Sequence, residues 1–244
     1  MTGRADNPRF PDAFTLIELL AAIMVMTVLV LILLPAFRSM QSSGLRRRAA
    51  AQAAEIAQAA LDYRQTYGTW PLENEASKSD DTALIIGGED LGEGNRHLEI
   101  APVVNLLRGL TREGDAPDSP VKENPRDIVF LELPASSLAM GNDEGANGFS
   151  TEKKGTPLDP WGRPYVLVLA LQRQESPFNS SVKVGRIEGG VETFVEIHRE
   201  GTGPDESFHV ESPDDAVAFS WGDPDTVTNA AMPTKVIGSW SQRE

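Results

Sequence analysis

The longest apolar stretch of the chain runs from Phe14 to Phe37, and Glu18 is the only ionisable side chain within it. A helix of about 20 apolar residues is long enough to cross the hydrocarbon core of a bilayer. The pattern therefore predicts a membrane-spanning helix over residues 14–39. A secretory signal peptide is disfavoured, because its apolar core is usually only about 7–15 residues long.

Residues 40–68 form the next segment with a clear pattern of secondary structure. Alanine, the strongest helix former, recurs between positions 49 and 60, and Ala53, Ala57, Ala60 and Leu61 follow the helical period. Gly68 is a suitable helix end, with Trp70-Pro71 just beyond it. The two segments together predict one long helix from about Phe14 to Tyr67.

Residues 69–157 are rich in glycine, aspartate, asparagine and serine and predict a loop-rich insertion. Two pieces of structure are expected within it. Residues 97–110 have helical spacing of apolar residues, with Pro102 in the first turn, and residues 128–133 indicate a short strand or a buried extended segment. Such an insertion usually decorates a surface, so partner specificity is expected there.

Residues 158–244 predict an antiparallel sheet, which makes the fold class α+β. Glu188-Gly-Gly190 indicates a hairpin between residues 181–187 and 191–198, and apolar and polar residues alternate in the second of these segments. We expect strands at 165–171, 181–187, 191–198 and 216–221 in one antiparallel meander, with a last extended piece at 235–240.

A rigid turn is expected where this sheet domain begins. It comprises Asp159, Pro160, Trp161, Gly162, Pro164 and Tyr165. The prolines disfavour helix, and glycine permits an unusual backbone angle. We expect Asp159 to bond turn amides and Trp161 to pack on the domain.

Composition and charge exclude several classes of function. The chain of 244 residues has a net charge of −14, which is a poor match for nucleic-acid phosphates, so no nucleic-acid partner is expected. It contains no cysteine, so disulfides and thiol chemistry are excluded. No nucleophile elbow, zinc-binding His-Glu-x-x-His or phosphate-cradling glycine motif is present, so the chain is not expected to be an enzyme.

Phe14-Thr-Leu-Ile-Glu-Leu19, behind a polar leader of residues 1–13, resembles the prepilin signature of type IV pilins and of type II secretion pseudopilins. The resemblance implies a pilin-like fold, in which a long N-terminal spine helix packs on a C-terminal antiparallel sheet. It also implies cleavage by prepilin peptidase between Ala13 and Phe14, N-methylation of Phe14, and a role for Glu18 in filament assembly. Ala13 departs from the glycine that the family usually has there, and Pro35 matches a proline that loosens the helix.

The same resemblance implies the location and the partners. The leader would be cytoplasmic and the C-terminal domain periplasmic or part of a filament, with a single pass through the inner membrane. Partners would be the membrane, copies of this chain, other pseudopilins or pilins, the peptidase and the assembly platform. The arginines at 38 and 46–48 oppose this orientation under the positive-inside rule.

Two further segments resemble the major pseudopilin of type II secretion. One is Asp159-Pro-Trp-Gly-Arg-Pro-Tyr165, whose role would be structural. The other is Ser220-Trp-Gly-Asp-Pro-Asp225, near which major pseudopilins bind calcium. Ser220, Asp223 and Asp225 supply the oxygen ligands that calcium prefers, yet few carboxylates follow, so an ordinary Asp-Pro turn is the alternative. No other cofactor is expected.

The function that follows is a structural pseudopilin that polymerises to drive protein export. Two alternatives stay open. The chain could be a minor type IV pilin of a surface fibre, or a membrane-anchored exported binding protein that never polymerises.

Overall fold

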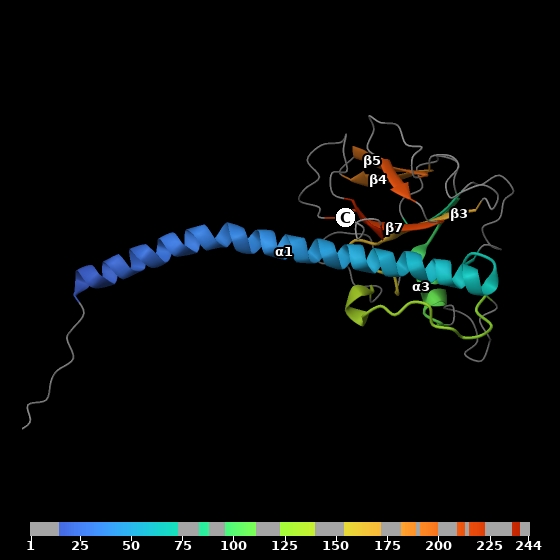
Figure 1. The fold of residues 1–244 in the computed structure, drawn as a ribbon, viewed down its shortest axis with the longest axis horizontal. Helices are drawn as coiled ribbons and strands as arrows, with labels where there is room; N and C mark the ends of the chain where they lie inside the picture. Colours follow the sequence, from blue (N-terminus) through green and yellow to red (C-terminus); the bar gives the residue numbers. More distant parts are fainter. Residues whose placement is uncertain are drawn as a thin grey trace, which may run out of the picture. The chain divides into compact units, whose positions relative to one another are not determined.

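In a computed structural model, the chain forms two compact units, Met1–Gly44 and Leu45–Glu244. In the second unit, helices and strands form successive layers around a buried core (Figure 1). The residues that the structure describes are 15–72, 83–87, 96–110, 123–139, 154–171, 182–188, 191–199, 209–212, 215–222 and 236–239. Side chains are not described at 33–40, 96–97, 186–188, 191–194, 198–199 and 209–212.

Helix α1 runs from Leu16 to Tyr67. It ends where the sequence predicted, because Gly68 adopts a φ of 76° and its N–H donates to the carbonyl of Arg64 at 2.8 Å. Just beyond, the indole of Trp70 donates to the carbonyl of Ala170 at 2.8 Å. Arg64 stacks over the Trp70 ring, 4.3 Å from its centroid, and forms an ion pair with Asp215. These contacts hold the C-terminal end of α1 against the sheet.

A five-stranded sheet has the order β2-β1-β3-β7-β8. Its strands are β1 (Ala83–Ile86), β2 (Arg96–Leu98), β3 (Val166–Ala170), β7 (Ala216–Ser220) and β8 (Ile237–Gly238). The central strand β3 pairs antiparallel with both β1 and β7, whereas β1 pairs parallel with β2. All five residues of β3 are buried, because other layers cover both of its faces.

A second sheet contains three strands in the order β4-β5-β6. These are β4 (Val182–Glu188), β5 (Val191–Arg199) and β6 (His209–Ser212). The predicted hairpin is confirmed, but Glu188 pairs with Val191 and so belongs to β4 rather than to the connection, where the sequence had placed it. The predicted single meander is wrong: β3 pairs with β1 and β7 rather than with β4, and β6 runs parallel to β5. The hairpin contributes to a separate sheet that covers one face of the larger one.

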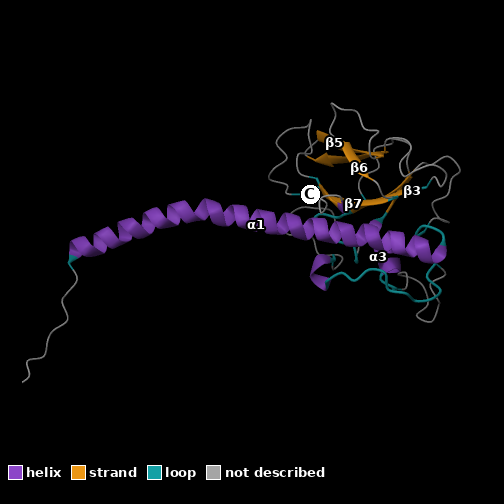
Figure 2. Ribbon diagram, in the orientation of Figure 1, coloured by secondary structure: helices purple, strands orange, loops and turns teal. Residues whose placement is uncertain are grey.

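The two faces of the five-stranded sheet belong to different apolar clusters. Figure 2 shows α1 on one side of β3 and β7 and the strands β5 and β6 on the other. Leu167 and Leu169 of β3 pack with residues of α1, including Ile56, on one face. Val166 and Val168 pack on the other face with residues of β4 and β5. A β-strand directs alternate side chains to opposite faces, so one short apolar strand joins both clusters. Helices and mainly antiparallel strands thus build an α+β fold.

Residues 69–157 contribute more to the core than the sequence suggested, because β1, β2 and helix α3 (Ile100–Leu107) all come from this segment. Pro102 lies in the first turn of α3, as expected, but the predicted helix began too early, since Arg96–Leu98 forms β2. Residues 128–133 are extended without joining a ladder. The amides of Phe130 and Leu131 donate to the Leu107 carbonyl at 2.8 and 3.0 Å, and a 3-10 turn, η1 (Ala135–Ser137), follows.

Candidate functional site

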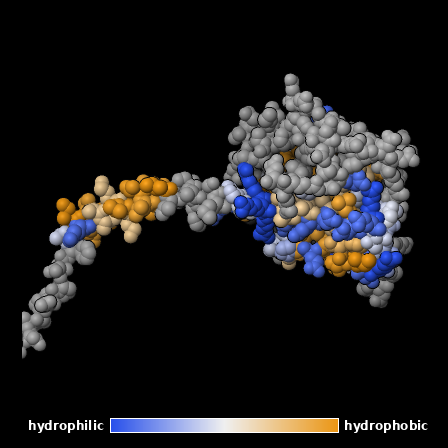
Figure 3. All heavy atoms as spheres, viewed as in Figure 1, coloured by the Kyte–Doolittle hydropathy of each residue, from blue (hydrophilic) through white to orange (hydrophobic). Residues whose placement is uncertain are grey.

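The residues singled out by the sequence lie in two separate places, and the first is the N-terminal part of α1. Every described side chain from Leu16 to Ile32 is exposed, with 82% of the Leu16 surface and 52% of the Val28 surface accessible. Figure 3 shows this part of the helix as a mainly hydrophobic surface. Monomeric soluble proteins seldom expose large contiguous apolar patches, so this surface is unusual for a protein of that kind.

Glu18 closes the first turn of this helix. Its Oε2 accepts hydrogen bonds from the backbone N–H of Thr15 at 3.0 Å and from the Thr15 hydroxyl at 2.8 Å. In return, the Glu18 N–H donates to the Thr15 hydroxyl at 3.3 Å. This reciprocal arrangement is a capping box, which satisfies donors that a helix start leaves unpaired. The spacing Thr-x-x-Glu could have predicted it from sequence.

The other residues of the prepilin signature are less fully described. Ala13 and Phe14 lie outside the described residues, and α1 continues through Pro35, whose side chain is not described. Among helices of the described part, none is both long enough and apolar enough to span a bilayer.

The second place is the turn that precedes β3. Asp159 Oδ1 accepts the backbone N–H groups of Trp161 at 2.9 Å and of Arg163 at 2.8 Å, as the sequence led us to expect. The Asp159 amide also donates to the Arg163 carbonyl at 2.7 Å, and Gly162 adopts a φ of 81°. A positive φ costs glycine little, which explains why this residue occupies the turn.

The same carboxylate connects the turn to the end of β7. The Ser220 hydroxyl donates to Asp159 Oδ2 and accepts the Gly222 N–H at 2.9 Å, while the Arg163 guanidinium donates to the Gly222 carbonyl at 3.0 Å. Burial raises the pKa of Asp159 above its ordinary value, although hydrogen bonds from Ser220 and the turn amides oppose that rise. Buried polar groups of this kind are costly unless paired, so the network specifies one conformation.

Two aromatic residues connect the turn to α1. The Tyr165 hydroxyl lies 3.0 Å from Gln52 Oε1 and 3.3 Å from the Ala49 carbonyl oxygen, and burial raises its pKa. Trp161 packs against a small cluster of Ala49, Ala50 and Ile237. The site therefore joins α1, β3, β7 and β8 within the second unit, and its contacts are those of a structural junction.

The calcium hypothesis concerns the same segment. Ser220 directs its hydroxyl into the Asp159 network, whereas Asp223 and Asp225 lie outside the described residues. The part of the chain that the structure describes contains no group of three histidine, aspartate or glutamate side chains placed to hold a metal ion.

Sequence reasoning missed several residues of these junctions. Gln52 and Arg163 read as an ordinary polar helix position and an ordinary turn residue, yet both are buried. Asn124 precedes Pro125, and nothing else in its local sequence marks it. Its Oδ1 accepts the Tyr67 hydroxyl at 2.6 Å and the Ile128 N–H at 3.2 Å, so it connects the end of α1 to residues 123–128. No local pattern marks such residues, because their partners are distant in sequence.

Comparisons with protein-family models, curated proteins and solved structures found no match to this chain.

Proposed function

We propose that this protein is a pseudopilin: a subunit anchored in the inner membrane that is processed by prepilin peptidase and polymerises to drive protein export through a type II secretion-like system. The observation that carries the proposal is the start of α1. There, Glu18 is the only ionisable residue of a long apolar run that begins with a prepilin-like signature. The described side chains that follow it are exposed on every face of the helix.

An exposed apolar helix needs an apolar environment. Burying one leucine, isoleucine or valine side chain stabilises by about 1.5–3 kcal/mol. A bilayer would supply this environment before assembly, and neighbouring helices would supply it within a filament. The sequence continues the apolar run to Phe37, which gives the length that a spanning segment requires.

Glu18 would make the contact between neighbouring subunits specific. Its capping bonds are both accepted by Oε2. Cleavage before Phe14 would create a new α-amino group four residues earlier, about 6 Å away along a helix axis. The same group on a neighbouring subunit would be able to pair with the Glu18 carboxylate, which would otherwise be costly in an apolar environment.

The second unit supports a pilin-like architecture. Residues of α1 such as Ile56 and Ala60 pack on one face of a mainly antiparallel sheet. The Asp-Pro-Trp-Gly turn holds the first strand after the insertion against α1 through Tyr165 and Gln52. A helix with an exposed apolar beginning and a buried end, attached to a globular domain, suits a subunit that packs helix against helix.

The first test is the N-terminal residue and mass of the protein purified from its native membranes. We expect a chain that begins at Phe14 and carries one additional methyl group. An intact leader in a host with active prepilin peptidase would refute the proposal and favour the non-polymerising anchored protein.

The second test separates the charge of Glu18 from its capping role. Glu18→Gln retains an oxygen that can accept the Thr15 hydrogen bonds but removes the charge, whereas Thr15→Ala weakens the cap and keeps the charge. We expect Glu18→Ala and Glu18→Gln to abolish filament assembly, with Thr15→Ala close to wild type. Assembly by Glu18→Gln would show that capping, rather than pairing with an amine, is what Glu18 contributes.

The remaining alternatives differ in these results. A minor type IV pilin would share processing and dependence on Glu18, but its deletion would impair a surface fibre, measured as loss of adhesion or retraction, rather than protein secretion. A non-polymerising anchored protein would keep its function when Glu18 is replaced.

A further inference from the structure

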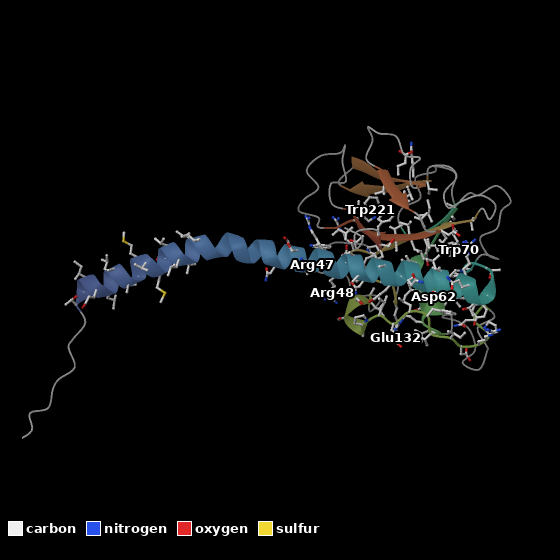
Figure 4. All side chains as sticks on the ribbon, in the orientation of Figure 1. Arg47, Arg48, Asp62, Trp70, Glu132 and Trp221 are labelled. Carbon is white, nitrogen blue, oxygen red and sulfur yellow. The ribbon has the colours of Figure 1, made fainter. Side chains whose placement is uncertain are left out.

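An open groove of about 790 Å³ lies on the second unit, between α1 and the extended residues 128–133. Its lining mixes apolar and polar residues, and the apolar ones include Val129, whose exposed fraction is 53%, and Phe130. Its rim is acidic, because Glu55 and Glu132 are exposed and Asp62 is half-buried beside them. Figure 4 shows Asp62 on α1 and Glu132 on the neighbouring segment.

An exposed basic cluster, Arg46–Arg48, precedes this groove on α1. Arg47, Ala51, Glu55, Gln58 and Asp62 succeed one another at intervals of three or four residues, so they form one stripe along the helix. The stripe is basic at its beginning and acidic at its end. Figure 3 shows strongly hydrophilic residues beside hydrophobic ones on the visible face of this unit.

The opposite charges are too far apart to pair within one molecule. At 1.5 Å per residue, Arg47 lies about 12 Å from Glu55 and about 22 Å from Asp62 along the helix axis. Among the described residues, the structure contains the ion pair of Arg64 with Asp215, and the Arg46–Arg48 cluster forms none with the acidic rim. The stripe therefore carries complementary charges that only another molecule can bring together.

We propose that the groove binds the Arg46–Arg48 cluster of a second copy of this chain. The inference rests on the proposed function and adds a specific contact between subunits. A parallel copy displaced along the helix axis by about 12–22 Å would place its arginines level with Glu55 and Asp62. Because the two surfaces differ, the contact is head-to-tail and can continue from copy to copy, as an open filament requires.

The chemistry of the groove suits arginine. The aliphatic part of an arginine side chain packs on apolar surface such as Val129 and Phe130 while its guanidinium remains at a charged rim. Planar guanidinium groups also form paired hydrogen bonds with carboxylates. Since rim charges are screened by salt, the contact should weaken as ionic strength rises.

The test uses two full-length variants with opposite reversals, expressed in cells that assemble the wild-type protein into filaments. One variant carries Arg46→Glu, Arg47→Glu and Arg48→Glu; the other carries Glu55→Lys, Asp62→Lys and Glu132→Lys. We expect each alone to reduce the pelletable filament fraction about tenfold or more, because like charges then face each other. Coexpression should restore filaments, since each variant offers what the other lacks.

Lys183→Glu is the matched control, because Lys183 is exposed on β4 outside the groove. It should leave the filament fraction unchanged. Restoration on coexpression supports the contact even if a single variant is less stable. Failure of coexpression, or normal assembly of either variant alone, overturns it. Loss of assembly confined to the arginine variant also overturns it and indicates that the arginines contact anionic lipid instead.

Cysteine crosslinking measures the contact directly, because the chain contains no cysteine of its own. Arg47→Cys combined with Asp62→Cys should give a ladder of disulfide-linked multimers under oxidising conditions, while Arg47→Cys with Lys183→Cys should not. The absence of a ladder in assembled filaments refutes this contact but leaves the proposed function intact. A wild-type protein that is processed but never assembles refutes both.

Discussion

Two parts of helix α1 show opposite burial despite a shared secondary structure. From Leu16 to Ile32 every described side chain is exposed, although nearly all are apolar. From Leu45 to Tyr67 one face is buried, and Ala53, Ile56 and Ala60 have no accessible surface. The first part has no partner among the described residues, whereas the second packs on a sheet built from strands more than a hundred residues apart. Apolar character and burial within the chain are therefore separate properties, because isoleucine is exposed at position 23 and fully buried at position 56 of the same helix.

The largest expected effect comes from the same substitution in each part. Ile56→Ala should lower the free energy of unfolding of the second unit by about 2–5 kcal/mol, because it leaves a cavity in a closed core. Ile23→Ala should change it by less than about 0.5 kcal/mol, because Ile23 is exposed. Urea unfolding of the full chain in detergent, followed by tryptophan fluorescence, measures both. Equal losses of unfolding free energy in the two variants would contradict the difference in burial between the two parts of α1.

The Asp159 network should give the next largest effect. Asp159→Ala leaves two turn amides and the Ser220 hydroxyl without their acceptor, which should cost about 2–4 kcal/mol. Asp62→Ala, at a partly exposed rim, is the control and should cost less than about 0.5 kcal/mol. The same urea titration compares them. A small loss for Asp159→Ala would mean that water or another side chain replaces the carboxylate.

The pH dependence of Asp159 has a definite sign. Its pKa is raised by burial, so the folded protein holds the proton at pH values where the unfolded chain has lost it. Its contribution to stability is therefore complete below the ordinary pKa of 3.8 and decreases as pH rises from there through the folded value. Urea unfolding at several pH values across that range gives the pH dependence of stability for the wild type and for Asp159→Asn. The decrease in stability that Asp159 causes should be absent in the variant. An unchanged profile would assign the dependence to other groups.

A smaller effect is expected at the hydrogen bond between Tyr165 and Gln52. Tyr165→Phe and Gln52→Ala should each lower stability by about 0.5–1.5 kcal/mol. The double variant should lose less than the sum, because the two side chains share one interaction. A double-mutant cycle by urea unfolding measures that coupling. Strict additivity would show that the contact contributes nothing to stability.

The smallest effect is a stabilisation at Gly44, within α1. A Cβ atom added there meets nothing within 4 Å, so Gly44→Ala should favour the helix by about 0.5–1 kcal/mol. Gly162→Ala is a useful contrast, because the positive φ of Gly162 should make that substitution destabilising. Thermal unfolding followed by circular dichroism at 222 nm distinguishes the two. Destabilisation by Gly44→Ala would indicate that this helix position needs glycine.

Local patterns predicted the elements that local forces stabilise. The end of α1 at Gly68 and the hairpin at residues 188–191 were predicted, because glycine placement and residue alternation act over a few positions. The bonding of Asp159 to its turn amides was predicted for the same reason. The partners of Asn124, Gln52 and Ser220 were not, since they depend on segments brought together only by folding.

The errors have one physical origin. Ala83–Ile86 lies in a region of loop-like composition, yet it forms β1, which pairs through backbone hydrogen bonds with one edge of β3. The hairpin of β4 and β5 was expected to extend the sheet of β3, but its buried valines cover one face of that sheet. A wholly apolar strand such as β3 requires cover on both faces, and a strand's own sequence does not specify which segment provides it.

By itself, the sequence determined the α+β class, the cap of Thr15 with Glu18, the end of α1 and the turn at Asp159, because each follows from propensity, spacing or backbone angle. Only the tertiary structure decided which strands pair, that two sheets form rather than one, and that a groove with an acidic rim lies on the same helix stripe as an arginine cluster. These depend on side chains distant in sequence that could each occupy the same buried surface, and local patterning does not specify which of them does.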